Sequence, residues 1–234
     1  MKFLTLLSAF VATVYSEEIT TANGRPPPKM MAEAPIDPIP YTKVTEKVYM
    51  DIAMEGEHVG RFVFGMFGET TPKTVANFVT IANGSHIGND GKALHYKGTV
   101  FHRMFNNFIA QGGDVTFGNG AGSESIYGNR FPDENIRLVR HHRPYLLGMA
   151  NSGKDDNGSQ FYVSMKEVHW DLTSVVFGEL IDGHEVLYKM RSNSNSTGIP
   201  VKEFMITDCG TLKSDDLPID GLWTLEDLRE KALQ

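Results

Sequence analysis

The sequence predicts a mostly β fold, a closed antiparallel β-barrel capped by two α-helices. Short strand-like runs separated by glycine-rich turns recur from residue 47 to residue 212, and two isolated stretches in that range have helical periodicity. The chain has 234 residues, of which 41% are hydrophobic and 22% charged, and this composition suits one globular domain with appendages.

Two segments precede the predicted domain. Residues 1–16 begin with Lys2, continue with an apolar run and end in small residues, which is typical of a secretory signal peptide; the alternative is a buried N-terminal helix. The run is too short to predict a membrane anchor. Residues 17–46 carry six of the eleven prolines, so we expect a stiff, extended linker.

The domain, residues 47–212, is expected to start with a hairpin and a helix. Val48, Met50, Ile52 and Met54 alternate with other residues, which is the period of a strand, and residues 61–67 form a second strand after a turn. Thr71 and Pro72 predict a helix start with a hydroxyl N-cap and proline at the first helical position.

The second half of the domain is predicted to be mostly strands. After a polar loop at 84–98, strand-like runs occupy residues 99–110, 146–150, 160–165, 174–180 and 199–209. Asp182 to Glu185 has the pattern of a capping box and predicts a second helix. Residues 213–234 are predicted to be an acidic extension with a short helix from Thr224.

Charge and cysteine content exclude several classes of function. A net charge of −7 argues against a nucleic-acid partner. Cys209 is the single cysteine and no two histidines are spaced as a metal pair, so we predict no intramolecular disulfide and no metal. We also expect no cofactor. Asn83 and Asn195 begin glycosylation sequons on predicted loops, whereas the Asn157 sequon lies in a motif where a glycan is not expected.

Arg103 is the most unusual residue of the strand-like runs. It is a permanent cation with five fixed donors among Phe101, Phe105 and Phe108, and an unpaired buried charge is costly. Taken alone, the stretch favours an amphipathic strand whose arginine reaches water. The glycines between 112 and 128 fit neither the dinucleotide nor the Walker pattern.

Seven motifs in fixed order identify a family resemblance across residues 47–212. They are Phe101-His102-Arg103, Phe108 to Asp114, Ser125 to Gly128, Gly148 to Asn151, Asn157 to Phe161, Val175 to Gly178 and Asp208-Cys209-Gly210. With them the chain resembles the cyclophilin family of peptidyl-prolyl isomerases. The resemblance implies an eight-stranded barrel with two helices, a monomer, and a groove that binds proline-containing peptides and the inhibitor cyclosporin.

The resemblance also implies the roles of individual residues. Arg103, Phe108 and Gln111 match the catalytic positions, with Arg103 as the donor to the prolyl nitrogen. The positions expected to contact substrate are Ile109, Gly120, Ala121, Gly122, Ala150, Asn151, Gln160, Tyr162, Trp170 and Leu172. The family usually has phenylalanine at the position of Tyr162.

The chain departs from the family pattern after Trp170. The family runs Trp-Leu-Asp-Gly-Lys-His, whereas this chain reads Trp170-Asp-Leu-Thr-Ser174, so one residue is missing and Ser174 replaces the groove histidine. We expect the chemistry to survive and binding at this edge to change. The predicted function is a secretory-pathway isomerase that assists protein folding, in the endoplasmic reticulum lumen or secreted. The alternative is a chaperone or scaffold module that binds proline segments with reduced turnover.

Overall fold

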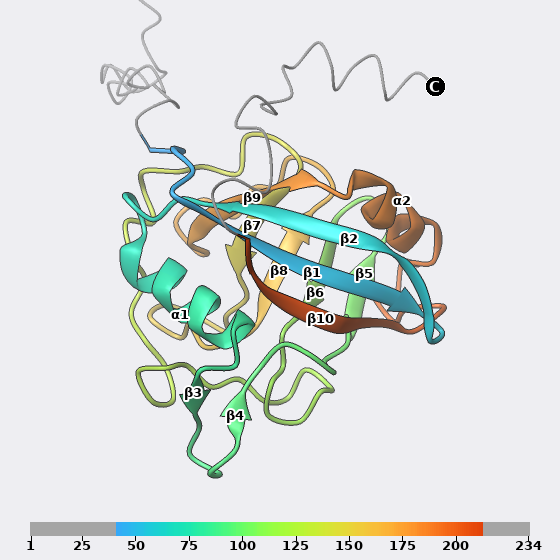
Figure 1. Ribbon diagram of the computed structural model, residues 1–234. Helices are drawn as coiled ribbons and strands as arrows, with labels where there is room; N and C mark the ends of the chain where they lie inside the picture. The colour runs from blue at the N-terminus through green and yellow to red at the C-terminus, as the bar shows by residue number, and fades with distance from the viewer. Residues whose placement is uncertain (1–40, 213–234) are drawn as a thin grey trace, which may run out of the picture. The chain divides into compact units, whose positions relative to one another are not determined.

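The computed structural model describes residues 41–212, which form ten β-strands and two α-helices (Figure 1). The strands are β1 Glu46–Met54, β2 Glu57–Met66, β3 His86–Ile87, β4 Ala93–Leu94, β5 Arg103–Phe105, β6 Ile109–Gly112, β7 Leu146–Met149, β8 Phe161–Ser164, β9 Val176–Asp182 and β10 Phe204–Leu212, and the helices are α1 Pro72–Ala82 and α2 His184–Ser192. The predicted signal peptide, nearly all of the predicted linker and the C-terminal helix lie outside the described residues.

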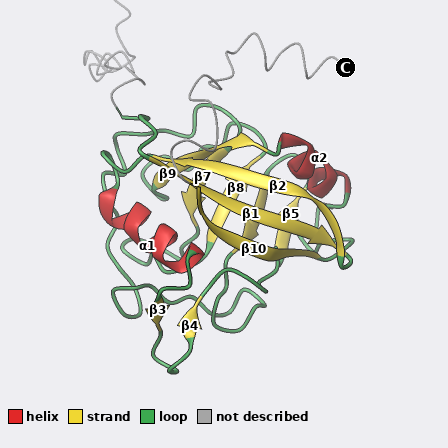
Figure 2. Ribbon diagram, in the orientation of Figure 1, coloured by secondary structure: helices red, strands yellow, loops and turns green. Residues whose placement is uncertain are grey.

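Eight of the strands form one curled antiparallel sheet in the order β10-β1-β2-β9-β7-β8-β6-β5, and β3 and β4 form a separate pair. Figure 2 shows the mostly β architecture, with the two helices at opposite ends of the sheet. The predicted mostly β fold with two helices is therefore confirmed. No helix within residues 41–212 is long and apolar enough to cross a membrane.

Closure of the barrel stays a prediction, because the named strands end at β10 on one side and at β5 on the other. The residues just before β5 support it. The backbone N–H groups of Gly98 and Phe101 donate to the carbonyls of Ile206 and Phe204 in β10, at 2.7 and 2.9 Å.

The core is built from the inward side chains of the curled sheet and from α1. Val48, Met50 and Ile52 are fully buried, as their alternation predicts. The rings of Phe78 in α1 and Phe161 in β8 meet edge to face with centroids 5.2 Å apart, a geometry favourable for aromatic pairs. This packing fixes β8, which carries part of the functional site.

The N-terminus of α1 is capped differently from the prediction. Thr71 and Pro72 do start the helix, but the Thr71 hydroxyl donates to the Phe67 carbonyl and makes no cap bond. Instead the Glu134 carboxylate accepts from the N–H groups of Lys73 and Thr74, at 3.1 and 2.9 Å. A carboxylate suits this place because the helix dipole is positive at its N-terminus.

Replacing this distant cap should destabilise the domain. We expect Glu134→Ala to lower the free energy of unfolding by about 0.5–2 kcal/mol, the range for loss of an N-cap. Urea denaturation measures the change. Glu167→Ala is the matched control, since Glu167 is an exposed carboxylate without a hydrogen bond to any residue of the range 41–212. Equal midpoints for the two variants would contradict the capping role.

Two other sequence predictions were wrong in detail. Residues 99–110 were expected to form one strand, but a turn containing Asn107, with φ of 54°, divides them into β5 and β6. Asparagine tolerates this left-handed backbone better than most residues. The capping box at 182–185 does not form, because Gly183 with φ of 89° is the N-cap and Asp182 accepts from the Gly183 N–H.

Candidate active site

Four adjacent strands bring the predicted site residues into one row. Arg103 of β5 is paired with Gln111 of β6, Gln111 with Tyr162 of β8, and Tyr162 with Gly148 of β7. Side chains directly opposite in antiparallel strands lie on the same face. The neighbouring positions Met104, Ala110 and Val163 are fully buried in the core, so the row stands on the outer face of the sheet.

Arg103 presents its guanidinium to solvent at the end of this row. The exposed side chain stacks on the Phe105 ring, with Cζ 4.8 Å from the ring centroid. Among residues 41–212 it has no ion-pair or hydrogen-bond partner. Phe101, which the sequence placed beside it, packs in the core. The donors of Arg103 are therefore available to a ligand.

Two glutamines next to Arg103 have their amide orientation fixed by the backbone. The Gln160 Nε2 group donates to the carbonyls of Gly120 and Gly122, at 2.9 and 2.6 Å. The Gln160 Oε1 atom therefore accepts from Gln111 Nε2, at 2.9 Å. This arrangement leaves Gln111 Oε1 without a partner in the described chain, so a free acceptor stands opposite the free donors of Arg103.

Asp114 anchors the loop that carries these glycine carbonyls. Its buried carboxylate accepts from five backbone N–H groups, at 2.8–3.1 Å, those of Thr116, Phe117, Asn119, Gly120 and Gly122. Burial by itself would raise the pKa of Asp114, but the N–H donors together outweigh it and lower the pKa. The sequence analysis assigned no role to Asp114; a carboxylate just before a glycine-rich turn was the available signal.

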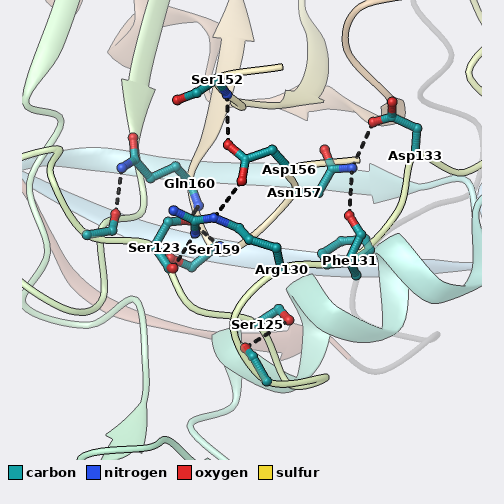
Figure 3. A network of polar contacts seen from close by, with 12 residues as sticks. Ser123, Ser125, Arg130, Phe131, Asp133, Ser152, Asp156, Asn157, Ser159 and Gln160 are labelled. Atoms are coloured by element: carbon teal, nitrogen blue, oxygen red, sulfur yellow. Dashed lines mark hydrogen bonds and ion pairs between the residues drawn. The ribbon is translucent and has the colours of Figure 1, made fainter. Parts of the chain in front are cut away.

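A cavity of about 290 Å³ lies beside this loop, lined in part by Thr116, Phe117, Ala121, Gly122, Glu124 and Arg130. Figure 3 shows the Arg130 guanidinium between Ser123 and Asp156. Arg130 Nε lies 2.9 Å from Asp156 Oδ1, and Arg130 also donates to the Ser123 carbonyl. Ala121 and Gly122 thus border a cavity, while the Gly120 carbonyl faces Gln160.

The apolar part of the site is formed by Phe108 and Trp170. Their ring centroids are 4.9 Å apart, and the Tyr162 ring meets Trp170 from the other side at 5.3 Å. Phe108 and Trp170 are half-buried, whereas Tyr162 and Ile109 are each only 1% exposed. Of these four predicted pocket residues, Phe108 and Trp170 therefore offer accessible apolar surface, whereas Tyr162 and Ile109 are buried.

The loop from Trp170 to Ser174 is short and tightly held. Its tip residue Leu172 has a φ of 68°, and its side chain is 58% exposed to solvent. Asn151 Nδ2 donates to the Thr173 carbonyl at 2.9 Å, and thus holds the loop. Ala150 gives its backbone N–H to the Gln160 carbonyl, so this group is not free to bind a peptide.

One residue of the site could not be found from the sequence. His141 is 1% exposed, and its ring joins Asp171 to Tyr162, with Nδ1 3.1 Å from Asp171 Oδ1 and Nε2 2.6 Å from the Tyr162 hydroxyl. Thirty and 21 residues separate His141 from these two partners. No local pattern signals such contacts.

A comparison with protein-family models decides the classification. The model of the cyclophilin-type peptidyl-prolyl cis-trans isomerase family matches residues 49–211. The chain belongs to the cyclophilin family. The match covers nearly all of the residues that the structure describes, and every residue of the row from Arg103 to Gly148 lies inside it.

The sequons of this cyclophilin differ in the state of the amide nitrogen to which a glycan attaches. Asn157 is buried, and its Nδ2 donates to Phe131 and Asp133. Asn195 Nδ2 donates to the Ile199 carbonyl within its own loop. Asn83 is exposed and uses its Oδ1 as an acceptor for the Thr211 N–H, which leaves Nδ2 unbonded among the described residues. Asn83 is therefore the most accessible candidate.

Proposed function

We propose that this cyclophilin domain catalyses the cis-trans isomerisation of X-Pro bonds without a cofactor, and that Arg103 stabilises the twisted amide. One observation carries the proposal. The unpaired donors of Arg103 lie on the same outer face as the free acceptor of Gln111 and the apolar pair Phe108 and Trp170.

The chemistry follows from the electronic structure of the amide. Rotation about an X-Pro bond crosses a barrier of about 18–20 kcal/mol, because amide resonance is lost in the twisted state. The prolyl nitrogen then becomes pyramidal and regains a lone pair. A fixed guanidinium donor aimed at that nitrogen interacts with the transition state more strongly than with either ground state, and this difference accelerates the reaction.

Substrate binding would use the groups around Arg103. Phe108 and Trp170 offer an apolar surface for the proline ring, and Gln111 Oε1 offers an acceptor for a peptide N–H or for Arg103 itself. The cavity at Ala121 and Gly122 would take a neighbouring residue of the peptide. The substrate class is therefore a proline-containing segment of a protein chain.

A second candidate function is supported by the covered pocket. Tyr162 and Ile109 are nearly inaccessible, and the shortened loop holds Ser174 where the family has a histidine. A module of this kind would bind proline segments as a chaperone or scaffold and would catalyse the isomerisation of their X-Pro bonds only slowly.

NMR exchange spectroscopy on a short proline peptide separates the two functions. Binding together with accelerated cis-trans exchange supports the isomerase. Binding at uncatalysed exchange rates supports the scaffold function, and the absence of both would contradict each of them.

We further propose that the protein enters the secretory pathway, on the basis of the apolar run in residues 1–16. Material from a eukaryotic secretory host should have lost this segment and begin near Glu17. Mass spectrometry of the intact secreted protein measures the new N-terminus. An unprocessed Met1 on secreted protein would rule out cleavage.

Cyclosporin should bind to the groove, but more weakly than to a cyclophilin with histidine at the position of Ser174. Loss of one polar contact costs about 0.5–1.5 kcal/mol, so we expect affinity to fall roughly three- to tenfold. Calorimetry on both proteins measures the ratio. A complete lack of binding would mean that the groove is deformed, and would favour the scaffold function.

A further inference from the structure

Three side chains from separate segments form a continuous hydrogen-bonded chain next to the Trp170 loop. It runs from the buried Tyr162 hydroxyl through the His141 ring to the Asp171 carboxylate, with contacts of 2.6 and 3.1 Å. The His141 backbone N–H also donates to Asp171 Oδ1, at 2.9 Å. A single oxygen of the loop, Asp171 Oδ1, thus bonds to two nitrogens of His141, a residue 30 positions away in the sequence.

The direction of each hydrogen bond follows from the chemistry of the ends. A carboxylate only accepts, so the His141 proton lies on Nδ1, and Nε2 accepts from the Tyr162 hydroxyl. Burial lowers the pKa of His141, although the Asp171 carboxylate opposes this, and burial raises the pKa of Tyr162. A neutral imidazole and a protonated phenol satisfy every bond of the chain.

The space for the Tyr162 hydroxyl depends on a glycine in the next strand. A Cβ atom built on Gly148 would lie 2.4 Å from both Cζ and the hydroxyl oxygen of Tyr162. Any larger residue at Gly148 would displace the ring from His141. A side-chain hydrogen bond from Ser174, at the position of the family's groove histidine, lowers the pKa of Tyr162, although the larger effect of burial raises it.

Tyr162 and Asp171, the two ends of this hydrogen-bonded series, both adjoin Trp170. Tyr162 contacts the Trp170 ring directly, and Asp171 is the residue that follows Trp170 in the loop. We propose that His141 is a positioning residue for proline binding, which holds Trp170 against Phe108 through Asp171 and Tyr162. This inference rests on the proposed function, because Trp170 and Phe108 form the surface proposed to take the proline ring. A surface fixed before binding loses less conformational entropy when the peptide binds.

Kinetics of variants in the full chain test the proposal. His141→Phe keeps a ring of similar shape and removes both ring hydrogen bonds, and Asp171→Ala removes the carboxylate. Each should raise KM for a proline peptide roughly two- to tenfold and leave kcat nearly unchanged, because the contact with proline is equal in the ground and transition states. Asp171→Asn keeps an acceptor oxygen and should stay close to wild type.

The coupling between the residues gives a sharper test. If the hydrogen bonds between Tyr162, His141 and Asp171 act as a unit, the double variant His141→Phe, Asp171→Ala should bind peptide no more weakly than either single variant. Glu167→Ala in the same region is the matched control and should leave both constants unchanged. Additive effects, or a fall in kcat at constant KM, would overturn the proposal. If His141→Phe does not fold, Tyr162→Phe breaks the same bond with the residue usual in the family.

A spectroscopic readout separates this inference from the isomerase proposal. The NMR chemical shifts of the two imidazole nitrogens of His141 should show a proton on Nδ1 and none on Nε2. Asp171→Ala should change these chemical shifts. Trp170 fluorescence, measured in a Trp223→Phe background because the chain has two tryptophans, should change in the same variants. These signals do not require turnover, so an inactive wild type with the expected spectra would refute the isomerase and leave the positioning chain intact. A different tautomer would overturn the positioning chain even in an active enzyme.

Discussion

Replacing Arg103 by alanine is expected to lower kcat/KM for proline peptides by about 10²-fold or more, the usual effect of losing a preorganised donor to the transition state. The guanidinium has no partner among residues 41–212, so its removal leaves no buried group unsatisfied. The fold should therefore persist, which circular dichroism can verify. The loss should reside in kcat, since the donor acts on the pyramidal nitrogen of the twisted state.

Arg61→Ala is the matched control for this experiment. Arg61 is likewise an exposed arginine on a strand, and its guanidinium carbon lies 4.3 Å from the centroid of the Tyr49 ring. It is on β2, outside the row of site residues, and its loss should not affect turnover. Arg103→Lys keeps the charge without the planar fork and should recover only part of the activity. A folded Arg103→Ala variant as fast as wild type would exclude Arg103 as the catalyst.

The second large effect is expected for Asp114. Asp114→Ala would remove the buried acceptor that five backbone N–H donors share, and hydrogen bonds to charged groups are worth about 1.5–3 kcal/mol each without being additive. We expect the free energy of unfolding to fall by about 3 kcal/mol or more, at the high end for single substitutions. Activity should fall too, because the loop positions the Gly120 and Gly122 carbonyls that orient Gln160 and Gln111.

The contribution of Asp114 should also depend on pH in a defined direction. Because its folded-state pKa lies below the ordinary value of 3.8, its stabilisation is complete above that value. The stabilisation is lost as the pH falls through the folded-state pKa. Urea denaturation between pH 7 and pH 2 should therefore show a smaller acid-dependent loss of stability for Asp114→Asn than for wild type.

Asp90→Ala is the control for this prediction. Asp90 also accepts from a backbone N–H two residues ahead, that of Lys92, but it is exposed on the β3–β4 turn. Its replacement should leave the unfolding midpoint nearly unchanged. Equal acid sensitivity of wild type and Asp114→Asn would contradict the anchoring role.

The sequence alone predicted the mostly β fold with two helices, and it named the candidate site residues. The alternation of Val48, Met50 and Ile52 fixed a strand and its buried face, because side chains of a strand alternate between two faces. The motif from Phe101 to Asp114 identified Arg103 and Gln111 as candidate site residues, but the turn at Asn107 that pairs them across β5 and β6 was not predicted. These features are encoded within a few residues of chain.

The tertiary structure alone decided which distant groups complete the site. The cap of α1 comes from Glu134, about 60 residues from the helix, and the hydroxyl of Tyr162 meets His141 from another loop. The burial of Tyr162 likewise depends on how the ring of Trp170 packs against it. A local pattern records backbone preference and burial, whereas these contacts depend on which loops the folded sheet brings together, and no short stretch of sequence carries that information.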